Sequence, residues 1–473
     1  MDLIKQSLSL IDKYVEKFGI EFEEENKYYS SVNGLKEYLN ENDIVLNKSD
    51  REELEKFIMS LDVPNAQRIF YDILNLEWID DDCNRKIIGI YDLTDNQILC
   101  YFSLIMSTIT YSQYHDMLGL KYNIIIWNTG FHKLAKLCRG KVIDLKTKET
   151  ISYPFDKFFN LNETEETSFE NIEQHIKQSS YVWATEKKDG STIIITKLKN
   201  GGLLITTNGS FENIQIDMAK EILKEKYSDF IENIMTGYTY IFELIHPENR
   251  IVLDYGQEKN LYLLAIRDLK TEKLVSLDEI HKVAEKYKFP VPEVYDFTNL
   301  ETMVNLAHNM KNANKEGWVL RIGNENEEIM VKLKLDEYFA MHKTFGKVKL
   351  GWVYKHMVIG DLDDFLSLLD EKQKNEVFEK INDITTVREK IKEEVILEAN
   401  LYLKEFNIKK KEFFDDRERM INIINKVFAS KSNLKSFIIQ YFKKEHLLDY
   451  QIEKINYKNM RPFFEKYGYN VNE

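Results

Sequence analysis

Five consecutive residues, Lys187 to Ser191 (KKDGS), stand directly before an apolar run of β-branched residues and could do nucleophilic chemistry. A free lysine has a pKa of about 10.4 and is a weak nucleophile at neutral pH, but burial or a neighbouring cation lowers that pKa. A strand end inside a cleft provides such surroundings. Lys187 is therefore a candidate nucleophile. The alternative is an ordinary solvated turn, since Lys, Asp and Gly are also common turn residues.

Four charged residues downstream are candidate partners for this lysine. They are Glu243 in IFELIHPENRIVLDY, Glu316 in KEGWVLRI, and Lys332 and Lys334 in VKLKLDEY. Lys332 and Lys334 lie two residues apart in a predicted strand, so both side chains leave the same face. Two ammonium groups on one face are costly in an apolar core and well suited to a phosphate. Glu243 lies within an apolar run, which favours a functional partner over a solvated surface position.

The elements that position these residues follow from the period of the apolar positions. Residues 1–85 have helical spacing, residues 86–345 contain short β-rich runs, and residues 346–473 return to helical spacing. The runs STIIITKL and LLITTN, joined by a turn with two glycines, predict a β-hairpin. We therefore expect an α+β protein: a central antiparallel-rich domain, flanked by an N-terminal helical module and an all-α C-terminal domain.

Two helix signals lie in the N-terminal module. The first helix is predicted from apolar residues at Ile4, Leu8, Ile11, Val15 and Phe18, which share one helical face. A second helix start is predicted at Ser49, because Glu52 lies three residues later and would complete a capping box.

The composition limits the functions that this chain could have. With 473 residues, 43% of them hydrophobic, two or three globular domains are expected. The net charge is −14, so no global positive field attracts nucleic acid, and any polyanion site must be local. Residues 1–80 have a net charge of −9 and residues 401–473 a net charge of +5. The C-terminal segment is therefore the better candidate for contacts with a phosphate backbone.

The three cysteines, Cys83, Cys100 and Cys138, have no CxxC spacing. This pattern argues against a disulfide framework and against a zinc site, and indicates reduced core thiols. No apolar run approaches the roughly 20 residues of a membrane span. We expect a cytoplasmic protein without membrane contact; the sequence leaves the oligomeric state open and a monomer is favoured.

The order of these motifs resembles that of the covalent nucleotidyltransferases, which comprise ATP-dependent ligases and mRNA capping enzymes and share a lysine-x-aspartate-glycine signature. The series KKDGS, FELIHPENRIV, EGWVLRI and VKLKLDEYFAMHK is similar to the RNA ligase 1 family of T-even phages, over residues 120–345. This resemblance implies an ATP-grasp-like nucleotidyltransferase domain. It also implies a nucleophile at Lys187 that forms a lysyl-AMP phosphoramidate.

The resemblance also implies roles for the residues around that nucleophile. Asp189 would orient the lysine and help to organise metal and ribose, and Gly190 would permit the turn. Glu243 would lie near the ribose and the metal-bound waters. Glu316 would associate with the metal.

Further implied contacts concern the phosphates of ATP. Lys332 and Lys334 would bind the α-phosphate, and Arg139 and Lys157 would hold the β- and γ-phosphates; both of the latter could also be ordinary solvated charges. The chain departs from the family at Asn208, where a Ser-Lys-Gly motif is usual and a lysine is missing. The role of that position is open, and Ser210 is a candidate to share it.

The function implied by the resemblance is an ATP-dependent RNA ligase that requires Mg²⁺ or Mn²⁺ and joins a 5′-phosphate to a 3′-hydroxyl. An all-α C-terminal domain, in place of the barrel of DNA ligases and capping enzymes, implies transfer RNA as the RNA partner and tRNA repair as the task. The alternatives are a capping-type guanylyltransferase and a catalytically decayed RNA-binding protein.

Overall fold

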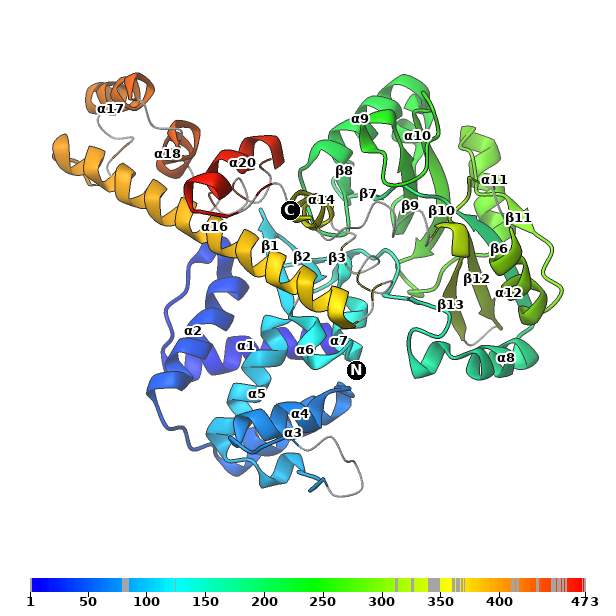
Figure 1. Ribbon diagram of the computed structural model, residues 1–473, viewed down its shortest axis with the longest axis horizontal. Helices are drawn as coiled ribbons and strands as arrows, with labels where there is room; N and C mark the ends of the chain where they lie inside the picture. Colours follow the sequence, from blue (N-terminus) through cyan, green and yellow to red (C-terminus); the bar gives the residue numbers. More distant parts are fainter. Residues whose placement is uncertain are drawn as a thin grey trace. The chain divides into compact units, whose positions relative to one another are not determined.

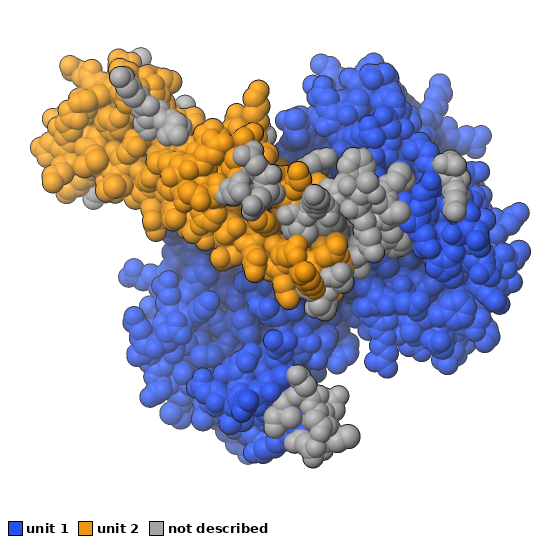
Figure 2. Space-filling view, in the orientation of Figure 1, with its two compact units in different colours: residues 1–338 blue, residues 339–473 orange. Residues whose placement is uncertain are grey.

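The computed structural model divides the chain into two compact units, residues 1–338 and 339–473 (Figure 2). It describes residues 2–78, 85–123, 125–310, 314–324, 327–338, 349–359, 371–409, 417–430, 434–443 and 457–469, with a few single residues between and after the last of these. No helix in these ranges combines the length and the apolar composition that a bilayer crossing requires.

The first half of unit 1 packs five helices against a small antiparallel sheet. The helices are α1 (Leu3–Phe18), α2 (Lys27–Glu41), α3 (Lys48–Ser60), α4 (Ala66–Ile73) and α5 (Asp95–Ser107). The sheet has the order β1-β2-β3-β4, from β1 (Ile109–Tyr114), β2 (Met117–Tyr122), β3 (Arg139–Asp144) and β4 (Thr150–Ser152). The short helices α6 (Ile126–Thr129) and α7 (Lys133–Leu137) connect β2 to β3.

One hydrophobic cluster runs from Ile4 to Ile143 through these helices and strands. The described core therefore has no break at residue 85, and α5 lies beyond that predicted boundary. The helical module of residues 1–85 remains a proposal as a separate domain. Cys138 is buried and Cys100 is half-buried, and both are free thiols, whereas Cys83 lies outside the described residues.

The helix signals in this region were correct for α1 and wrong at the start of α3. Ile4, Leu8, Ile11 and Val15 are buried on one face of α1. Helix α3 begins at Lys48, and its cap is Asn47, whose side chain accepts a hydrogen bond from the backbone N–H of Asp50. Asn47 caps as well as serine does, and it precedes Ser49 by two residues.

Two further sheets form the second half of unit 1 (Figure 1). One has the order β10-β9-β7-β8, from β7 (Ser191–Lys197), β8 (Leu203–Thr206), β9 (Tyr238–Ile245) and β10 (Asn260–Asp268). The other has the order β11-β6-β12-β13-β5, from β5 (Phe159–Asn160), β6 (Tyr181–Lys187), β11 (Val294–Tyr295), β12 (Gly317–Gly323) and β13 (Glu328–Lys334). The accompanying helices are α8 (Phe169–Gln178), α9 (Ile214–Lys226), α10 (Ser228–Asn233), α11 (Leu277–Tyr287) and α12 (Leu300–Asn309).

The strand pairing is antiparallel throughout these sheets, except between β13 and β5. The predicted hairpin is confirmed, since β7 and β8 pair and are joined by the turn at 198–202. The prediction of a mixed, antiparallel-rich α+β fold is also confirmed for this unit. Its arrangement as a separate central domain remains a proposal.

Gly317 lies in the middle of a row that crosses three strands. It pairs with Lys187 on β6 and with Lys334 on β13, so these three residues face the same side of the sheet. The backbone at Gly317 has a φ of +146°, and an added Cβ would lie 2.1 Å from the carbonyl oxygen of Leu333. Only glycine allows the two strands to approach this closely.

All the regular secondary structure in the described part of unit 2 is helical. Its helices are α14 (Leu350–Ile359), α16 (Glu371–Glu405), α17 (Arg417–Ala429), α18 (Lys435–Lys443) and α20 (Tyr457–Lys466). Apolar residues every three or four positions along α16, among them Val377, Ile384 and Ile391, are buried. In this unit Phe413 stacks on Phe442, and both rings are buried. These two aromatic residues therefore belong to the core of unit 2.

Replacing Gly317 by alanine should destabilise unit 1 strongly. Overpacking and backbone strain each cost about 1–3 kcal/mol, so we expect a total loss of about 2–4 kcal/mol. Gly201→Ala is the matched control, because Gly201 also has a positive φ of +88° but has open space around it; its strain should cost only about 1–2 kcal/mol. Thermal and denaturant unfolding of the two variants measures the difference. Equal losses would contradict the close approach of β12 and β13.

Candidate active site

A shared carboxylate joins the two lysines of the row described above. Glu316 immediately precedes β12, and its Oε2 lies 2.8 Å from Nζ of Lys187, while its Oε1 lies 3.0 Å from Nζ of Lys334. The carboxylate thus bridges the two lysine side chains. The three groups are almost fully enclosed, with Lys187 the most exposed at 17% of its side chain.

Lys188 points away from this cluster. Its Nζ lies 2.8 Å from Oε2 of Glu186, and it also lies 4.6 Å from the ring centroid of Tyr262. Glu186 neighbours Lys187 on β6 and therefore belongs to the opposite face of the strand. The two adjacent lysines thus have different surroundings, and only Lys187 meets Glu316 and Lys334.

Asp189 is fixed by hydrogen bonds on both carboxylate oxygens. The backbone N–H groups of Val252 and Leu253 donate to Oδ2, at 2.9 and 2.6 Å, and the hydroxyl of Tyr338 donates to Oδ1 at 2.9 Å. Its own backbone N–H donates to the hydroxyl of Tyr255. These contacts hold the segment that follows Lys187 in one conformation.

Gly190 brings this segment against β9. Its N–H donates to Oε1 of Glu243 at 3.0 Å. An added Cβ would lie 2.3 Å from the carbonyl oxygen of Leu244, and the φ of Gly190 does not lie in the left-handed region. Access to the left-handed region is therefore not the reason for glycine here, and the implied role of Gly190 in the turn stays a prediction. Glycine is required because two backbone segments approach each other closely.

Burial dominates the electrostatics of the two carboxyl groups beside Lys187. It raises the pKa of Glu243 to about 8, an effect that the Lys187 ammonium opposes and Glu316 increases. Burial and the nearby Glu316 also raise the pKa of Asp189. Glu243 is therefore mostly protonated at neutral pH in the absence of bound substrates. The solvated-surface alternative for Glu243 is excluded, since its side chain is buried.

Arg139, Lys157 and Lys332 gather around two phenylalanines at the start of β5. Phe158 has the Lys332 Nζ 5.0 Å and the Arg139 guanidinium 5.6 Å from its ring centroid. The Nζ of Lys157 lies 5.3 Å from the ring centroid of Phe159. Lys157 and Lys332 are buried, so neither is a solvated surface charge. β5 pairs in parallel with β13, and this pairing brings Arg139 and Lys157 towards Lys332 on β13.

Asn208 lies in a tight turn whose ends, Thr207 and Ser210, form an isolated bridge. The hydroxyl of Ser210 donates to the carbonyl oxygen of Glu212 at 2.7 Å, within this same loop. Trp318 on β12 is almost fully buried and belongs to the core.

The metal hypothesis for Asp189 and Glu316 gains no support from their geometry. Among the residues described, no three His, Cys, Asp or Glu side chains are arranged to hold an ion. Both oxygens of Asp189 accept hydrogen bonds, and both oxygens of Glu316 face lysines. Asp189 and Glu316 by themselves therefore do not form a metal centre. Mg²⁺ commonly uses one or two carboxylates together with substrate phosphates, and that arrangement could include Glu316.

The geometry described so far lies inside a region with known relatives. Residues 137–350 match a family model described as RNA ligase. We call residues 137–350 the RNA ligase region, because they are similar to that family. The RNA ligase region contains Arg139 and Lys334 and all the predicted site residues between them.

Individual relatives agree with this similarity. The chain is 30% identical over 237 residues to a protein described provisionally as an RNA ligase of Thermovibrio ammonificans, covering 49% of this chain and 59% of that one. It is 28% identical over 274 residues to a protein described provisionally as a bifunctional polynucleotide kinase/RNA ligase of Autographa californica nuclear polyhedrosis virus, covering 54% and 38%. The chain thus spans less than two thirds of the length of either relative.

The solved structures are more distant. An archaeal ATP-dependent RNA ligase gives a TM-score of 0.35 at 15% identity, covering 59% of this chain and 76% of that one. A similarity this low supports no inference about the site.

Three aromatic residues of the RNA ligase region were missed in the sequence. Tyr338 and Tyr255 hydrogen-bond the segment at Asp189, and Phe158 contacts Arg139 and Lys332. Tyr338 follows the lysine pair in VKLKLDEY, so its position next to a motif was a usable signal. Nothing in the local sequence distinguishes the other two, because their contacts come from strands far away in the chain.

The raised pKa of Glu243 predicts a stability effect of Glu243→Gln that depends on pH. Between pH 4.5 and 8 the folded state holds a proton on Glu243 that the unfolded state releases, so the wild type loses stability as the pH rises through this window. Glutamine imitates the protonated form and keeps an acceptor for Gly190. The variant should therefore lose less stability than the wild type between pH 5 and pH 8.5, by on the order of 3 kcal/mol.

Unfolding curves at the two pH values measure this difference without any substrate. Glu248→Gln is the control, since Glu248 is exposed and should change the pH profile little. A Glu243→Gln profile parallel to that of the wild type would show that Glu243 is ionised at neutral pH.

Proposed function

We propose that this protein is an ATP-dependent RNA ligase that seals a 5′-phosphate to a 3′-hydroxyl through a lysyl-AMP and an RNA-adenylate. One observation carries the proposal: within the RNA ligase region, Lys187 lies in a row with Lys334 and shares the carboxylate of Glu316 with it. Glu316, the proton acceptor, thereby contacts both the nucleophile Lys187 and the phosphate-binding cation Lys334.

In the first step, Nζ of Lys187 attacks the α-phosphorus of ATP. A nitrogen–phosphorus bond forms, the bond to the bridging oxygen breaks, and pyrophosphate leaves. Lys187 must first lose a proton, and Glu316 at 2.8 Å is the acceptor in contact with it. Lys334 and Lys332 stabilise the charge that grows on the α-phosphate. Arg139 and Lys157 hold the β- and γ-phosphates and orient the leaving group opposite the nucleophile.

The second and third steps use the same phosphate-binding lysines. A 5′-phosphate oxygen of the RNA attacks the phosphorus of the adenylate, and the bond to Nζ of Lys187 breaks. A 3′-hydroxyl then attacks the RNA 5′-phosphorus, and AMP leaves. Asp189 and Glu243 hold the segment after Lys187 during the cycle, through their contacts with the backbone at Val252, Leu253 and Gly190.

A divalent cation, Mg²⁺ or Mn²⁺, belongs to this proposal as a companion of ATP. When bound it would neutralise phosphate charge, held by phosphate oxygens and by Glu316 as a carboxylate ligand. Removal of divalent cations with a chelator should therefore stop adenylate formation.

Transfer RNA is the substrate class that we propose, with repair of a cleaved strand as the task. The support is the helical unit 2, which follows the RNA ligase region, together with the net charge of +5 on residues 401–473. Lys409 is exposed in this segment, whereas Lys410, Lys411 and Lys444 lie outside the described residues. Competition between a nicked transfer RNA and a linear strand with the same ends measures this preference.

Lys187→Ala should abolish the covalent AMP adduct, and Lys188→Ala should keep it. Of these two neighbouring lysines, only Lys187 contacts Glu316, while Lys188 pairs with Glu186 on the other face. Loss of Lys188 leaves the buried Glu186 without its ion pair, so we also expect reduced stability in that variant. The measurement is incorporation of labelled ATP into protein, normalised to the folded fraction. An adduct in Lys187→Ala would contradict the assignment.

The same labelling with GTP tests the other enzyme class. Label from ATP alone supports a ligase, label from GTP alone supports a capping enzyme, and a folded protein without either label supports an RNA-binding protein.

Sealing of RNA that already carries a 5′-adenylate should separate the roles of Lys187 and Glu316. This substrate no longer needs the lysine nucleophile, so Lys187→Ala should still seal it. Glu316→Gln should seal it poorly, because the change removes the charge that holds Lys334, and Lys334 acts on phosphate in every step. Rates of joining for the two folded variants give the answer, and equal rates would argue against distinct roles.

A further inference from the structure

Lys121 on β2 extends the row of cations beyond the active site. It is the cross-strand partner of Arg139 on β3, so the two side chains leave the sheet on the same face. Arg139 in turn shares the ring of Phe158 with Lys332. The cations therefore continue from β13 through Arg139 to Lys121. Lys121 lies outside residues 137–350, so the RNA ligase family model does not include it.

Three glycines allow the loop 207–211 to lie close to the strands that carry Lys121 and Arg139. An added Cβ on Gly140 would lie 2.8 Å from Cα of Asn208, and one on Gly119 would lie 2.9 Å from the ring of Phe211. An added Cβ on Gly209 would lie 2.9 Å from Nζ of Lys121. The ammonium group is thus next to the turn that contains Asn208.

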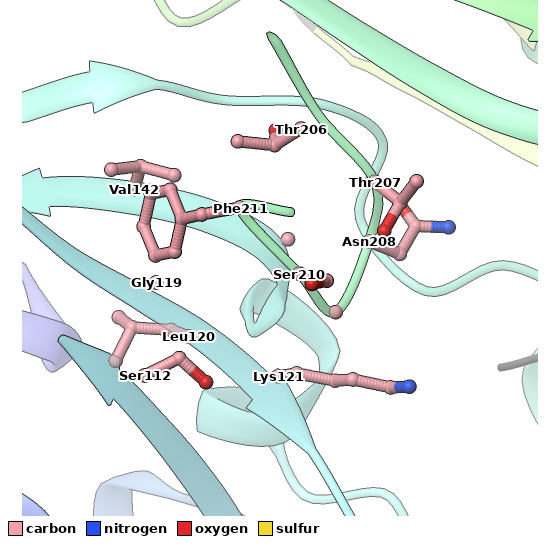
Figure 3. A pocket seen from close by; sticks show the side chains of 12 residues that line it. Ser112, Gly119, Leu120, Lys121, Val142, Thr206, Thr207, Asn208, Ser210 and Phe211 are labelled. Carbon is pink, nitrogen blue, oxygen red and sulfur yellow. The ribbon is translucent and has the colours of Figure 1, made fainter. Parts of the chain in front are cut away.

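The surroundings of this turn combine polar and apolar groups. A shallow pocket lies at the junction, and hydroxyl-bearing residues, Lys121 and Asn208 line it together with Leu120, Val142 and Phe211 (Figure 3). Figure 3 shows that the ends of the Lys121 and Asn208 side chains extend to the same side of the loop. Glu212, in the same segment, hydrogen-bonds to Tyr114. A cation and an amide on one edge, next to Arg139, form an arrangement that can bind phosphate oxygens.

We propose that Lys121 is a phosphate-binding residue that acts with the amide of Asn208. Position 208 of the loop is an asparagine and carries no charge. The ammonium group of Lys121, on β2, supplies a positive charge next to this loop. The proposal rests on the proposed ligase function. The ligand is a phosphate group, either from the β- and γ-phosphates of ATP or from the backbone of the RNA strand.

The test uses the full chain with Lys121→Met, which keeps most of the apolar stem and removes the charge. The first measurement is lysyl-AMP formation over a range of ATP concentrations. The second is sealing of, and salt-dependent binding to, RNA that already carries a 5′-adenylate. Lys146→Met is the control, because Lys146 follows the same sheet in the turn after β3, is 76% exposed and pairs with Asp116.

If Lys121 contacts the phosphates of ATP, kcat/KM for adenylate formation should fall roughly 10- to 100-fold, the usual range for a lost hydrogen bond to a charged group. If it contacts the RNA, the first measurement should be unchanged. Sealing should then weaken, and the log–log dependence of RNA affinity on salt should become shallower by about 0.7–0.9. Lys146→Met should resemble the wild type in both measurements.

Moving the cation to the loop gives a second, gain-of-function test. Lys121→Met combined with Asn208→Lys should recover most of the lost activity, because position 208 extends to the same side of the loop. A purely structural role of Lys121 would not be rescued in this way. Lys121→Arg should also retain activity, since it keeps the charge.

The proposal is overturned if folded Lys121→Met equals the wild type in both measurements. It is equally overturned if the loss in Lys121→Met is matched by a loss of thermal stability and is not rescued by Asn208→Lys. These outcomes differ from failure of the ligase function itself, in which the wild-type protein would form no lysyl-AMP and seal no adenylated RNA.

Discussion

The carboxylate of Glu316, held between Lys187 and Lys334, is the interaction on which the rest of the site depends. Two cations and one anion are buried together, so these three groups carry a net positive charge. Burying such a charge is costly unless a ligand supplies the opposite charge, and a phosphate does so. Gly317 makes the arrangement possible, because a side chain at that position would collide with the backbone of β13.

A second set of contacts joins the two sheets of the RNA ligase region at the residues that follow Lys187. Glu243 on β9 accepts a hydrogen bond from Gly190, and Asp189 accepts hydrogen bonds from Val252 and Leu253. One sheet therefore holds the lysine, while the other holds the backbone immediately after it. A nucleophile supported on both sides loses little further freedom when a nucleotide binds, which is the physical basis of preorganisation.

The N-terminal part of unit 1 contributes to this site through the sheet β1–β4. The core cluster continues from the first helices into β3. Arg139 is the first residue of β3, and its guanidinium contacts the ring of Phe158. The strong negative charge of residues 1–80 would repel an RNA backbone. We infer that this part acts by supporting β2 and β3, and that phosphate contacts come from two cations of these strands, Lys121 and Arg139.

The sequence by itself determined the features that depend on local patterns. The α1 helix and the β7–β8 hairpin follow from periodicity, and the spacing of Lys332 and Lys334 gives a shared face. It did not determine the reason for Gly190, because that reason is a backbone atom of β9 more than 50 residues away. Nor could it pair Lys121 with Arg139, since a cross-strand partner is set by the register of two strands, and no local pattern encodes that register.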